Sequence, residues 1–221
     1  MKYQLVYIIL IIISIIFSNE SILENKFRIS RIHYSGGGDW YSDPSSIPNL
    51  LDFISKNTDI KTSVNEEIVK IGDNNFYKNN YYYITGHGKI KLSQNEKNIL
   101  RKQLLSGSFL HADDNYGLDK SFRKLIEEIF PEKKFVELPP NHKIFNILYE
   151  FSDGLPKIHE HDNKRPQALG LFHNKKLIVL YTYESDLGDG WEDVKVHNVP
   201  IYKHESALKM GANIVTYFLV N

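Results

Sequence analysis

The stretch that decides the fold is residues 81–117, YYYITGHGKIKLSQNEKNILRKQLLSGSFLHADDNYG, which predicts a strand, a helix and a second strand in succession. Tyr81–Thr85 is aromatic and β-branched, which is typical of strands. Ser93 and Glu96 have the spacing of a capping box at the start of a helix. Ser108–Ala112 is the second predicted strand. A succession of this kind forms a βαβ unit, in which the two strands are parallel neighbours.

Residues that can carry chemistry follow both of these predicted strands. Gly86-His87-Gly88 follows the first strand, and Asp113 and Asp114 follow the second. Parallel neighbours end at the same edge of a sheet, where open α/β folds place their ligand sites. We therefore expect His87 and Asp113 to line one cavity that Asp39 also touches. His87, Asp113 and Asp114 are the candidate catalytic residues, because an imidazole and paired carboxylates can transfer protons or hold a cation.

A second group of candidate residues follows the first predicted strand of the domain, Lys26–Tyr34. The turn Ser35–Tyr41, SGGGDWY, contains three glycines, which let the backbone approach a ligand closely. It is not a phosphate loop, because the Lys-Ser/Thr ending of that motif is missing. The candidate ligand-binding residues are Gly37, Gly38, Asp39 and Trp40 in this turn, Gly86 in the turn after residues 81–85, and Asp186 in a later loop.

The rest of the chain alternates between helix and strand patterns. Asp43 is predicted to cap one helix and Asp119 a second helix with strong 3.6-residue periodicity. Leu169–His173 and Lys176–Tyr183 flank a short hairpin turn, and the chain ends in a helix over residues 204–219. This pattern predicts a flavodoxin-like three-layer α/β sandwich, with a mostly parallel sheet and a late antiparallel hairpin.

Two later segments resemble metal-binding patterns without completing them. His159-Glu160-His161 has ligand spacing but lies in a polar loop without a third ligand nearby, so we interpret it as solvated. Asp186–Gly190 lacks the alternating acids of a calcium loop and is interpreted as a turn. The chain contains no cysteine, which excludes disulfides, thiolate metal sites and a cysteine nucleophile.

The net charge bears on the partners of the protein, and the N-terminal segment bears on its location. The formal net charge is zero and no basic block is present, so a nucleic-acid partner is not expected. Leu5–Phe17 is apolar and uncharged, but it is shorter than the roughly 18–20 residues of a spanning helix. We predict a signal peptide or N-terminal membrane anchor over residues 1–25 and one α/β domain over residues 26–221. Export is favoured, with the domain periplasmic or otherwise outside the cytoplasm.

Several motifs together resemble one bacterial family of unknown function. They are YSGGGDWY at residues 34–41, ITGHG at 84–88, GSFLHADD at 107–114 and LPPNH at 138–142. The family is related in fold to class I glutamine amidotransferases, so the resemblance implies an amidotransferase-like domain. Its usual gene company of ATPases and von Willebrand-type domains implies partners in a membrane-associated assembly. Gly107-Ser108 stands where the family has two glycines, a change that leaves the turn intact.

Amidotransferase chemistry itself needs a cysteine nucleophile, so glutamine hydrolysis by that route is excluded. Two functional classes remain. The favoured one is a non-catalytic module that binds a ligand or a protein partner within a cell-envelope assembly, because no nucleophile is recognisable. The alternative is a hydrolase that uses His87 with Asp113 and Asp114, either alone or with a divalent metal. No cofactor is expected.

Overall fold

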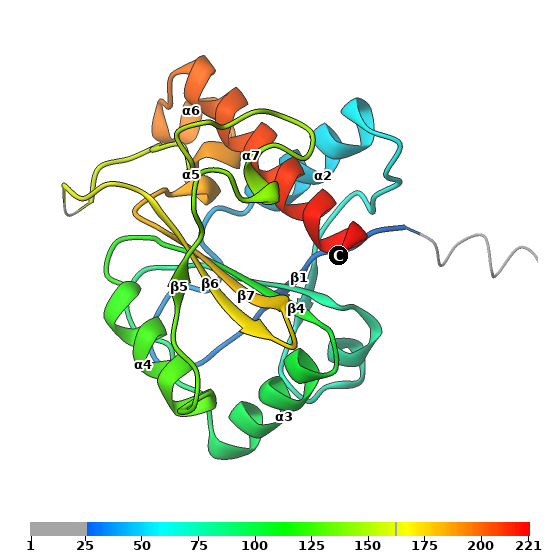
Figure 1. Cartoon of the computed structure of the whole chain (residues 1–221), viewed down its shortest axis with the longest axis vertical. Helices are drawn as coiled ribbons and strands as arrows, with labels where there is room; N and C mark the ends of the chain where they lie inside the picture. Colours follow the sequence, from blue (N-terminus) through cyan, green and yellow to red (C-terminus); the bar gives the residue numbers. More distant parts are fainter. Residues whose placement is uncertain (1–25, 162) are drawn as a thin grey trace, which may run out of the picture.

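A computed structural model describes residues 26–161 and 163–221, so the predicted signal peptide or anchor at residues 1–25 lies outside the described residues. A seven-stranded sheet with the order β2-β1-β3-β4-β7-β6-β5 crosses the domain (Figure 1). Its strands are β1 (Ser30–Ile32), β2 (Glu67–Val69), β3 (Tyr81–Ile84), β4 (Phe109–Asp113), β5 (Val136–Glu137), β6 (Gln167–His173) and β7 (Lys176–Tyr183). The strands β2, β1, β3, β4 and β7 are each parallel to the next one in this spatial order. The strand β6 is antiparallel to both β7 and β5.

The central βαβ unit is confirmed. β3 and β4 are parallel neighbours, with Ile84 opposite Ala112. Between them, α3 (Gln94–Leu105) begins with the predicted capping box: the Ser93 hydroxyl accepts from the backbone of Glu96, and the Glu96 carboxylate accepts from the backbone of Ser93. Both strands are buried along their whole length, as expected of a parallel strand with helices on both faces.

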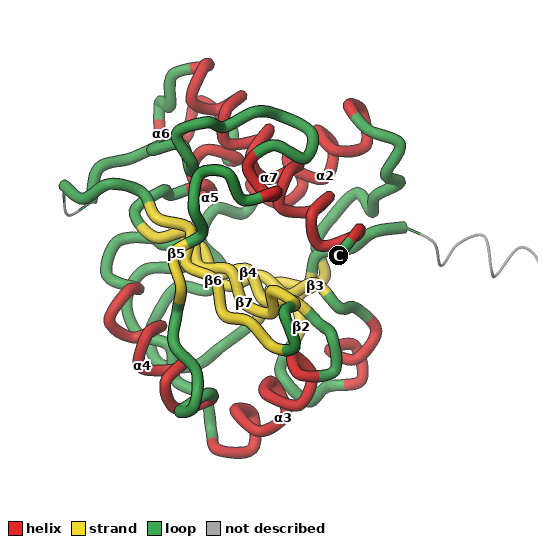
Figure 2. Tube along the Cα trace, viewed as in Figure 1, coloured by secondary structure: helices red, strands yellow, loops and turns green. Residues whose placement is uncertain are grey.

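Helices cover both faces of the sheet, which confirms the three-layer α/β sandwich. Figure 2 shows α3 and α4 on one side and α2, α5, α6 and α7 on the other. These helices are α2 (Ser46–Asn57), α4 (Asp119–Ile129), α5 (Leu187–Trp191), α6 (Val194–His197) and α7 (Ile201–Val220), and the 3-10 helices are η1 (Asn74–Lys78) and η2 (Lys143–Phe145). Each face has its own buried apolar cluster. Trp191 is fully buried in the cluster under α7, where its indole N–H donates to the Ala207 carbonyl at 2.8 Å.

Two predicted helix caps are wrong, and both aspartates make other contacts. α2 begins at Ser46 rather than beside Asp43, whose backbone is left-handed (φ 55°). The Asp43 carboxylate instead accepts from Asn115 Nδ2 at 3.2 Å. Asp119 is the first residue of α4 rather than its cap, and its carboxylate accepts from Arg123 at 2.6 Å.

None of the helices within residues 26–161 and 163–221 has the length and apolar character that a membrane crossing requires.

Candidate functional site

Carboxylates and imidazoles from four separate segments gather beyond the carboxyl ends of β4 and β7. One comes from the loop before α2, two from the loop before β6, two from α5 and the residue before it, and one from α6. We call this group the His/Asp cluster; its members are Asp43, His159, His161, Asp186, Asp189 and His197.

Asp186 and Asp189 are the centre of the cluster. His159 Nδ1 lies 2.6 Å from Asp189 Oδ2 and 3.3 Å from Asp186 Oδ2, and His161 Nε2 lies 2.9 Å from Asp186 Oδ2. The two nitrogens of His197 each lie 3.4 Å from a carboxylate, Nδ1 from Asp189 and Nε2 from Asp43. One imidazole therefore bridges the two carboxylates near β7, and another bridges α5 to the loop before α2.

Two overlapping sets of three residues have their potential ligand atoms close enough to share a cation. In each set, one potential ligand atom per residue lies within 4.8 Å of the others. The sets are Asp43, Asp189 and His197, and His159, Asp186 and Asp189. Asp189 belongs to both sets, so it would contact an ion in either position.

The backbone around the cluster is held in conformations that L residues seldom adopt. Asp43, Glu184 and Asp186 all have a left-handed backbone, with φ between 55° and 59°. A residue in this region costs on the order of 1 kcal/mol or more, and such residues gather at functional sites. Gly188 has a different constraint: an added Cβ would lie 2.9 Å from Tyr83 Oη and 3.2 Å from Asp113 Oδ2. Only glycine lets α5 approach the sheet this closely.

Burial and charge shift the pKa values of the cluster in opposite directions. Burial raises the pKa of Asp43 to about 7, and the neighbouring Asp189 carboxylate adds to the effect. Hydrogen bonds to Asp186 and Asp189 raise the pKa of His159 to about 10, and Asp186 likewise raises the pKa of His161. Burial opposes ionisation of Asp186, but hydrogen bonds from the two histidines outweigh it and lower the pKa of this carboxyl. Without an ion, the proton on His159 offsets part of the negative charge.

Three buried polar atoms in or beside the cluster have no hydrogen-bond partner among the described residues. They are Asp186 Oδ1, Asn115 Oδ1 and His197 Nε2. Asn115 Nδ2 is already committed to Asp43, which leaves its amide oxygen as the free acceptor. An unpaired buried group of this kind costs about 1–3 kcal/mol. A bound cation would use these lone pairs, because carboxylate and amide oxygens and an imidazole nitrogen are all metal ligands.

Asp113 lies beneath the cluster and is fully buried. Its carboxylate accepts hydrogen bonds from Thr182 Oγ1 on β7 and, at 2.5 Å, from the backbone N–H of Gly188 on α5. Burial raises the pKa of Asp113 well above its usual range. Asp113 therefore joins β4 to β7 and to α5, with both carboxylate oxygens in use.

Asp114 points to a different set of partners. Its carboxylate accepts from Tyr181 Oη at 2.9 Å and from the backbone N–H of Glu184 at 3.0 Å. Burial raises the pKa of Asp114 to about 6. It borders a hollow of about 260 Å³ on the outer side of the cluster, lined by Asp114, Tyr116, Gly117, Asp119, Lys120, His161 and Glu184. His161 is the one member of the cluster that lines this hollow, and it belongs to neither set of three potential ligands.

His87 lies away from Asp113. Its side chain is 53% exposed, and Nδ1 lies 3.0 Å from Asp39 Oδ2, while its backbone N–H donates to the other oxygen of Asp39. The expected shared cavity is therefore wrong: Asp113 is covered by α5 with its oxygens paired, whereas His87 faces solvent. The catalytic roles of His87, Asp113 and Asp114 stay predictions.

The candidate residues of the glycine turn form a region of their own beside His87. A Cβ on Gly38 would lie 2.9 Å from the His87 carbonyl, and one on Gly86 would lie 2.8 Å from the Asp39 carbonyl. The two turns thus pack backbone against backbone. A Cβ added to Gly37 would have no other atom within 4 Å. The Trp40 ring stacks on the His33 ring, with the two ring centroids 4.2 Å apart. Their ligand-binding roles stay predictions, and Asp186 lies in the His/Asp cluster instead.

The interpretation of His159 and His161 as solvated is wrong, because Asp186 and Asp189 supply the missing partners. The sequence carried two local signals of this arrangement. One was the His-Glu-His spacing, and the other was the pair of aspartates three residues apart, which a single helical turn brings to one face. His197 and Asp43 carried no such signal, since only the folded chain brings α6 and the loop before α2 together.

The family model described as "Domain of unknown function (DUF4159)" matches residues 28–219, which is nearly all of the described chain. No curated protein matches it.

Proposed function

We propose that this chain, which belongs to the DUF4159 family of unknown function, binds a divalent transition-metal ion in its His/Asp cluster. One observation carries the proposal: within each of two sets of three residues, the potential ligand atoms lie within 4.8 Å of one another. The sets are Asp43, Asp189 and His197, and His159, Asp186 and Asp189. Asp186 Oδ1 and His197 Nε2 support it, because both are buried and make no hydrogen bond, although Nε2 lies 3.4 Å from Asp43, and an ion would satisfy both. The carboxylates of the cluster alone would not support a metal site.

The donor set favours a transition metal over calcium or magnesium. Imidazole nitrogen mixed with carboxylate oxygen suits Zn²⁺, Mn²⁺, Fe²⁺, Co²⁺ and Ni²⁺. Calcium and magnesium prefer sets made of oxygen alone. Binding requires neutral imidazoles, so an entering ion displaces the proton that Asp186 and Asp189 hold on His159. We therefore expect proton release on binding and an affinity that rises with pH.

The metal site fits a binding module better than an enzyme. Asp113, which could have been a general base, is buried and fully paired. A metal-dependent hydrolase is the second candidate, favoured by the hollow of about 260 Å³ that reaches His161. A metal ion there would supply an activated water. Hydrolysis of p-nitrophenyl esters by the metal-loaded chain, absent in the metal-free chain and in a cluster variant, would favour the hydrolase.

The setting proposed for this module is outside the cytoplasm, in a cell-envelope assembly with protein partners. The support is the uncharged run Leu5–Phe17 at the N-terminus. Cell fractionation tests this part separately. We expect the protein in the membrane or exported fraction, and full-length protein in the cytosol would overturn the placement without affecting the metal site.

Calorimetric titration of the purified chain with Zn²⁺, after dialysis against a chelator, tests the metal site. The wild-type chain is expected to bind Zn²⁺ stoichiometrically and Ca²⁺ far more weakly. The variant His159→Ala/His197→Ala should bind about 100-fold more weakly, since it removes one ligand from each set. The matched control His87→Ala/His173→Ala removes two histidines outside the cluster and should bind as wild type. Weak binding by the wild type, or an equal loss in both variants, would exclude the cluster as the site.

A further inference from the structure

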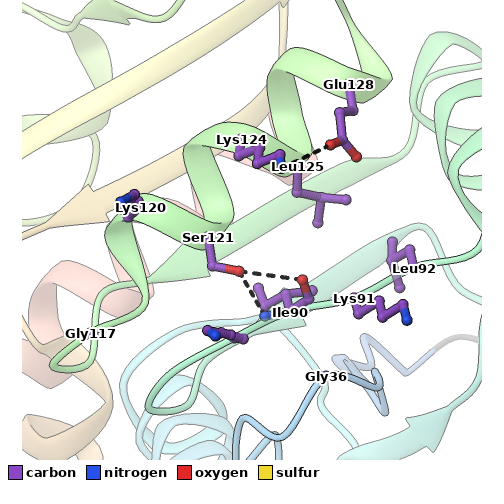
Figure 3. Close-up of a pocket in the computed structure, with 11 residues that line it drawn as sticks. Gly36, Ile90, Lys91, Leu92, Gly117, Lys120, Ser121, Lys124, Leu125 and Glu128 are labelled. Atoms are coloured by element: carbon purple, nitrogen blue, oxygen red, sulfur yellow. Dashed lines mark hydrogen bonds and ion pairs between the residues drawn. The ribbon is translucent and has the colours of Figure 1, made fainter.

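A groove lies on the other side of the sheet, between α4 and the segment 89–92 that leads into α3. Its volume is about 620 Å³. Figure 3 shows Leu125 projecting from α4 toward this segment, with Gly117 and Lys120 near one end of the groove and Glu128 near the other. Ile90, Leu92 and Leu125 line it with the small apolar surface that they leave exposed, 8%, 7% and 4% of each residue. The groove is therefore large enough for a small molecule with an apolar body, since small-molecule sites measure about 300–1,000 Å³.

Four lysines surround this apolar surface: Lys89, Lys91, Lys120 and Lys124. Among the described residues, no carboxylate lies within 4.0 Å of Lys89, Lys91 or Lys120. Glu128 is the one acid that lines the groove. It lies 3.1 Å from Lys97 and 3.9 Å from Lys124, so it does not offset the other three lysines.

The acid nearest to Lys120 in the chain also has partners elsewhere. The Asp119 carboxylate accepts from Arg123 at 2.6 Å and from Tyr181 Oη at 3.1 Å. The chain as a whole has a formal net charge of zero. The positive charge of the groove is thus a local feature, which attracts anions.

The two walls of the groove are fixed to each other and to the glycine turn. Ser121 Oγ on α4 accepts from the backbone N–H of Ile90 at 2.8 Å, and the Lys91 N–H donates to the Ser35 carbonyl at 2.6 Å. A Cβ on Gly36 would lie 2.7 Å from the Lys89 carbonyl, so the turn can pack here only as glycine. A ligand would enter a preformed groove, which lowers the entropic cost of binding.

We infer that this groove binds a small anionic amphipathic molecule, with a carboxylate or phosphate group near Lys89 and Lys120 and an apolar body against Ile90, Leu92 and Leu125. The volume of the groove favours a small molecule over a membrane surface, because attraction to a charged surface requires no cavity. The groove shares Gly117 and Lys120 with the hollow that reaches His161. Binding of a ligand in the groove does not require the metal ion, so either proposal can fail without the other.

Two dyes with the same kind of apolar body separate the contribution of charge from that of apolar contact. Anilinonaphthalene sulfonate is anionic, and N-phenyl-1-naphthylamine is its uncharged analogue. Fluorescence titration of the full chain should show tighter binding of the anionic dye, weakening as salt is added. The variant Lys89→Gln/Lys120→Glu should bind the anionic dye about tenfold more weakly and the uncharged dye as before. Lys120→Glu also places an acid in the first turn of α4, which favours the helix.

The control variant Lys61→Gln/Lys134→Glu makes the same change in charge at two exposed lysines outside the groove. We expect it to bind both dyes as wild type does. Unchanged affinity of the groove variant for the anionic dye would overturn the inference. So would an equal loss for the uncharged dye, or an equal loss in the control variant. Sedimentation with phosphatidylglycerol vesicles that needs Lys89 and Lys120, without dye binding there, would assign the lysines to a membrane surface instead.

Discussion

The His87–Asp39 pair and the His/Asp cluster both join imidazoles to carboxylates beyond the carboxyl ends of parallel strands, but they differ in burial. The His87 and Asp39 side chains are 53% and 33% exposed, whereas those of His161 and Asp186 are 8% and 4% exposed. Water screens the first pair, so its contribution to stability is small. In the His/Asp cluster, carboxylates that are shielded from water must be neutralised by protons on the imidazoles or by a bound ion. The same residue types therefore give a surface contact in one place and a candidate metal site in the other.

The largest contrast is expected in metal affinity. Asp189→Ala removes the carboxylate that both sets of ligands share, so Zn²⁺ binding should weaken about 100- to 1,000-fold, equivalent to roughly 3–4 kcal/mol. Asp39→Ala removes a carboxylate of the exposed pair and should change the affinity less than twofold. Calorimetric titration of both variants checks this. Equal effects would erase the distinction between the two regions.

The second contrast concerns the buried acid beneath the cluster. Asp113→Ala leaves the buried Gly188 N–H without its acceptor and removes one of the two acceptors of Thr182 Oγ1, which keeps the Ala112 carbonyl at 3.2 Å. We expect a loss of roughly 2–4 kcal/mol in the free energy of unfolding, measured in urea. Asp113→Asn keeps an oxygen for Gly188 and an amide for Thr182, so it should lose less. A loss for the asparagine as large as that for the alanine would contradict the role given to these hydrogen bonds.

The sequence predicted the frame of the molecule better than its site. Residues 81–117 carry local signals, namely a capping box, an apolar stripe and two buried strands, and the structure has each element there. The direction of the Asp113 side chain could not be read in the same way. β4 runs one residue further than predicted, so Asp113 still pairs in register with Thr182 and points under α5. The direction of the Asp113 side chain therefore depends on β7, which lies far along the chain.

The site itself depends on contacts between distant segments. His159 and His161 looked solvated because their carboxylate partners follow a strand on the far side of a hairpin. Asp43 looked like a helix cap because an aspartate before a proline commonly is one. Burial in the folded chain gives it a different role. Local patterns identify residue types, whereas the fold decides which of them meet.

A third contrast is expected in how the stability of the metal-free and the metal-loaded protein depends on pH. The pKa of His159, about 10, lies above its ordinary value of 6.5, so this group stabilises the metal-free fold fully below pH 6.5 and less as pH rises toward 10. We expect the free energy of unfolding to fall by roughly 1–3 kcal/mol over that interval, after allowing for partial exposure. With Zn²⁺ bound the trend should reverse, because the ion needs a neutral imidazole.

Urea denaturation at several pH values, with and without Zn²⁺, measures both trends. His159→Gln cannot take up the proton, so its metal-free stability should depend less on pH over this interval than that of the wild type. A metal-free wild type that becomes more stable relative to this variant as pH rises would contradict the proton on His159.

The smallest effect is expected at the exposed pair. A double-mutant cycle between His87→Ala and Asp39→Ala should give a coupling energy of at most about 1 kcal/mol, reduced further by salt. Thermal or urea denaturation of the four proteins measures it. A coupling of several kcal/mol that salt does not reduce would mean that His87 and Asp39 form a buried site in solution.

The most direct test of the metal site is anomalous diffraction from a crystal of the protein grown with Zn²⁺, collected on both sides of the zinc absorption edge. The account predicts an anomalous peak at the carboxyl edge of β4 and β7, within about 2.0–2.3 Å of imidazole nitrogens and carboxylate oxygens from His159, Asp186, Asp189, His197 or Asp43. No peak is expected at His87 and Asp39. A peak at that exposed pair with none in the cluster, or a cluster that keeps the His159–Asp189 contact with no peak at saturating Zn²⁺, would contradict it.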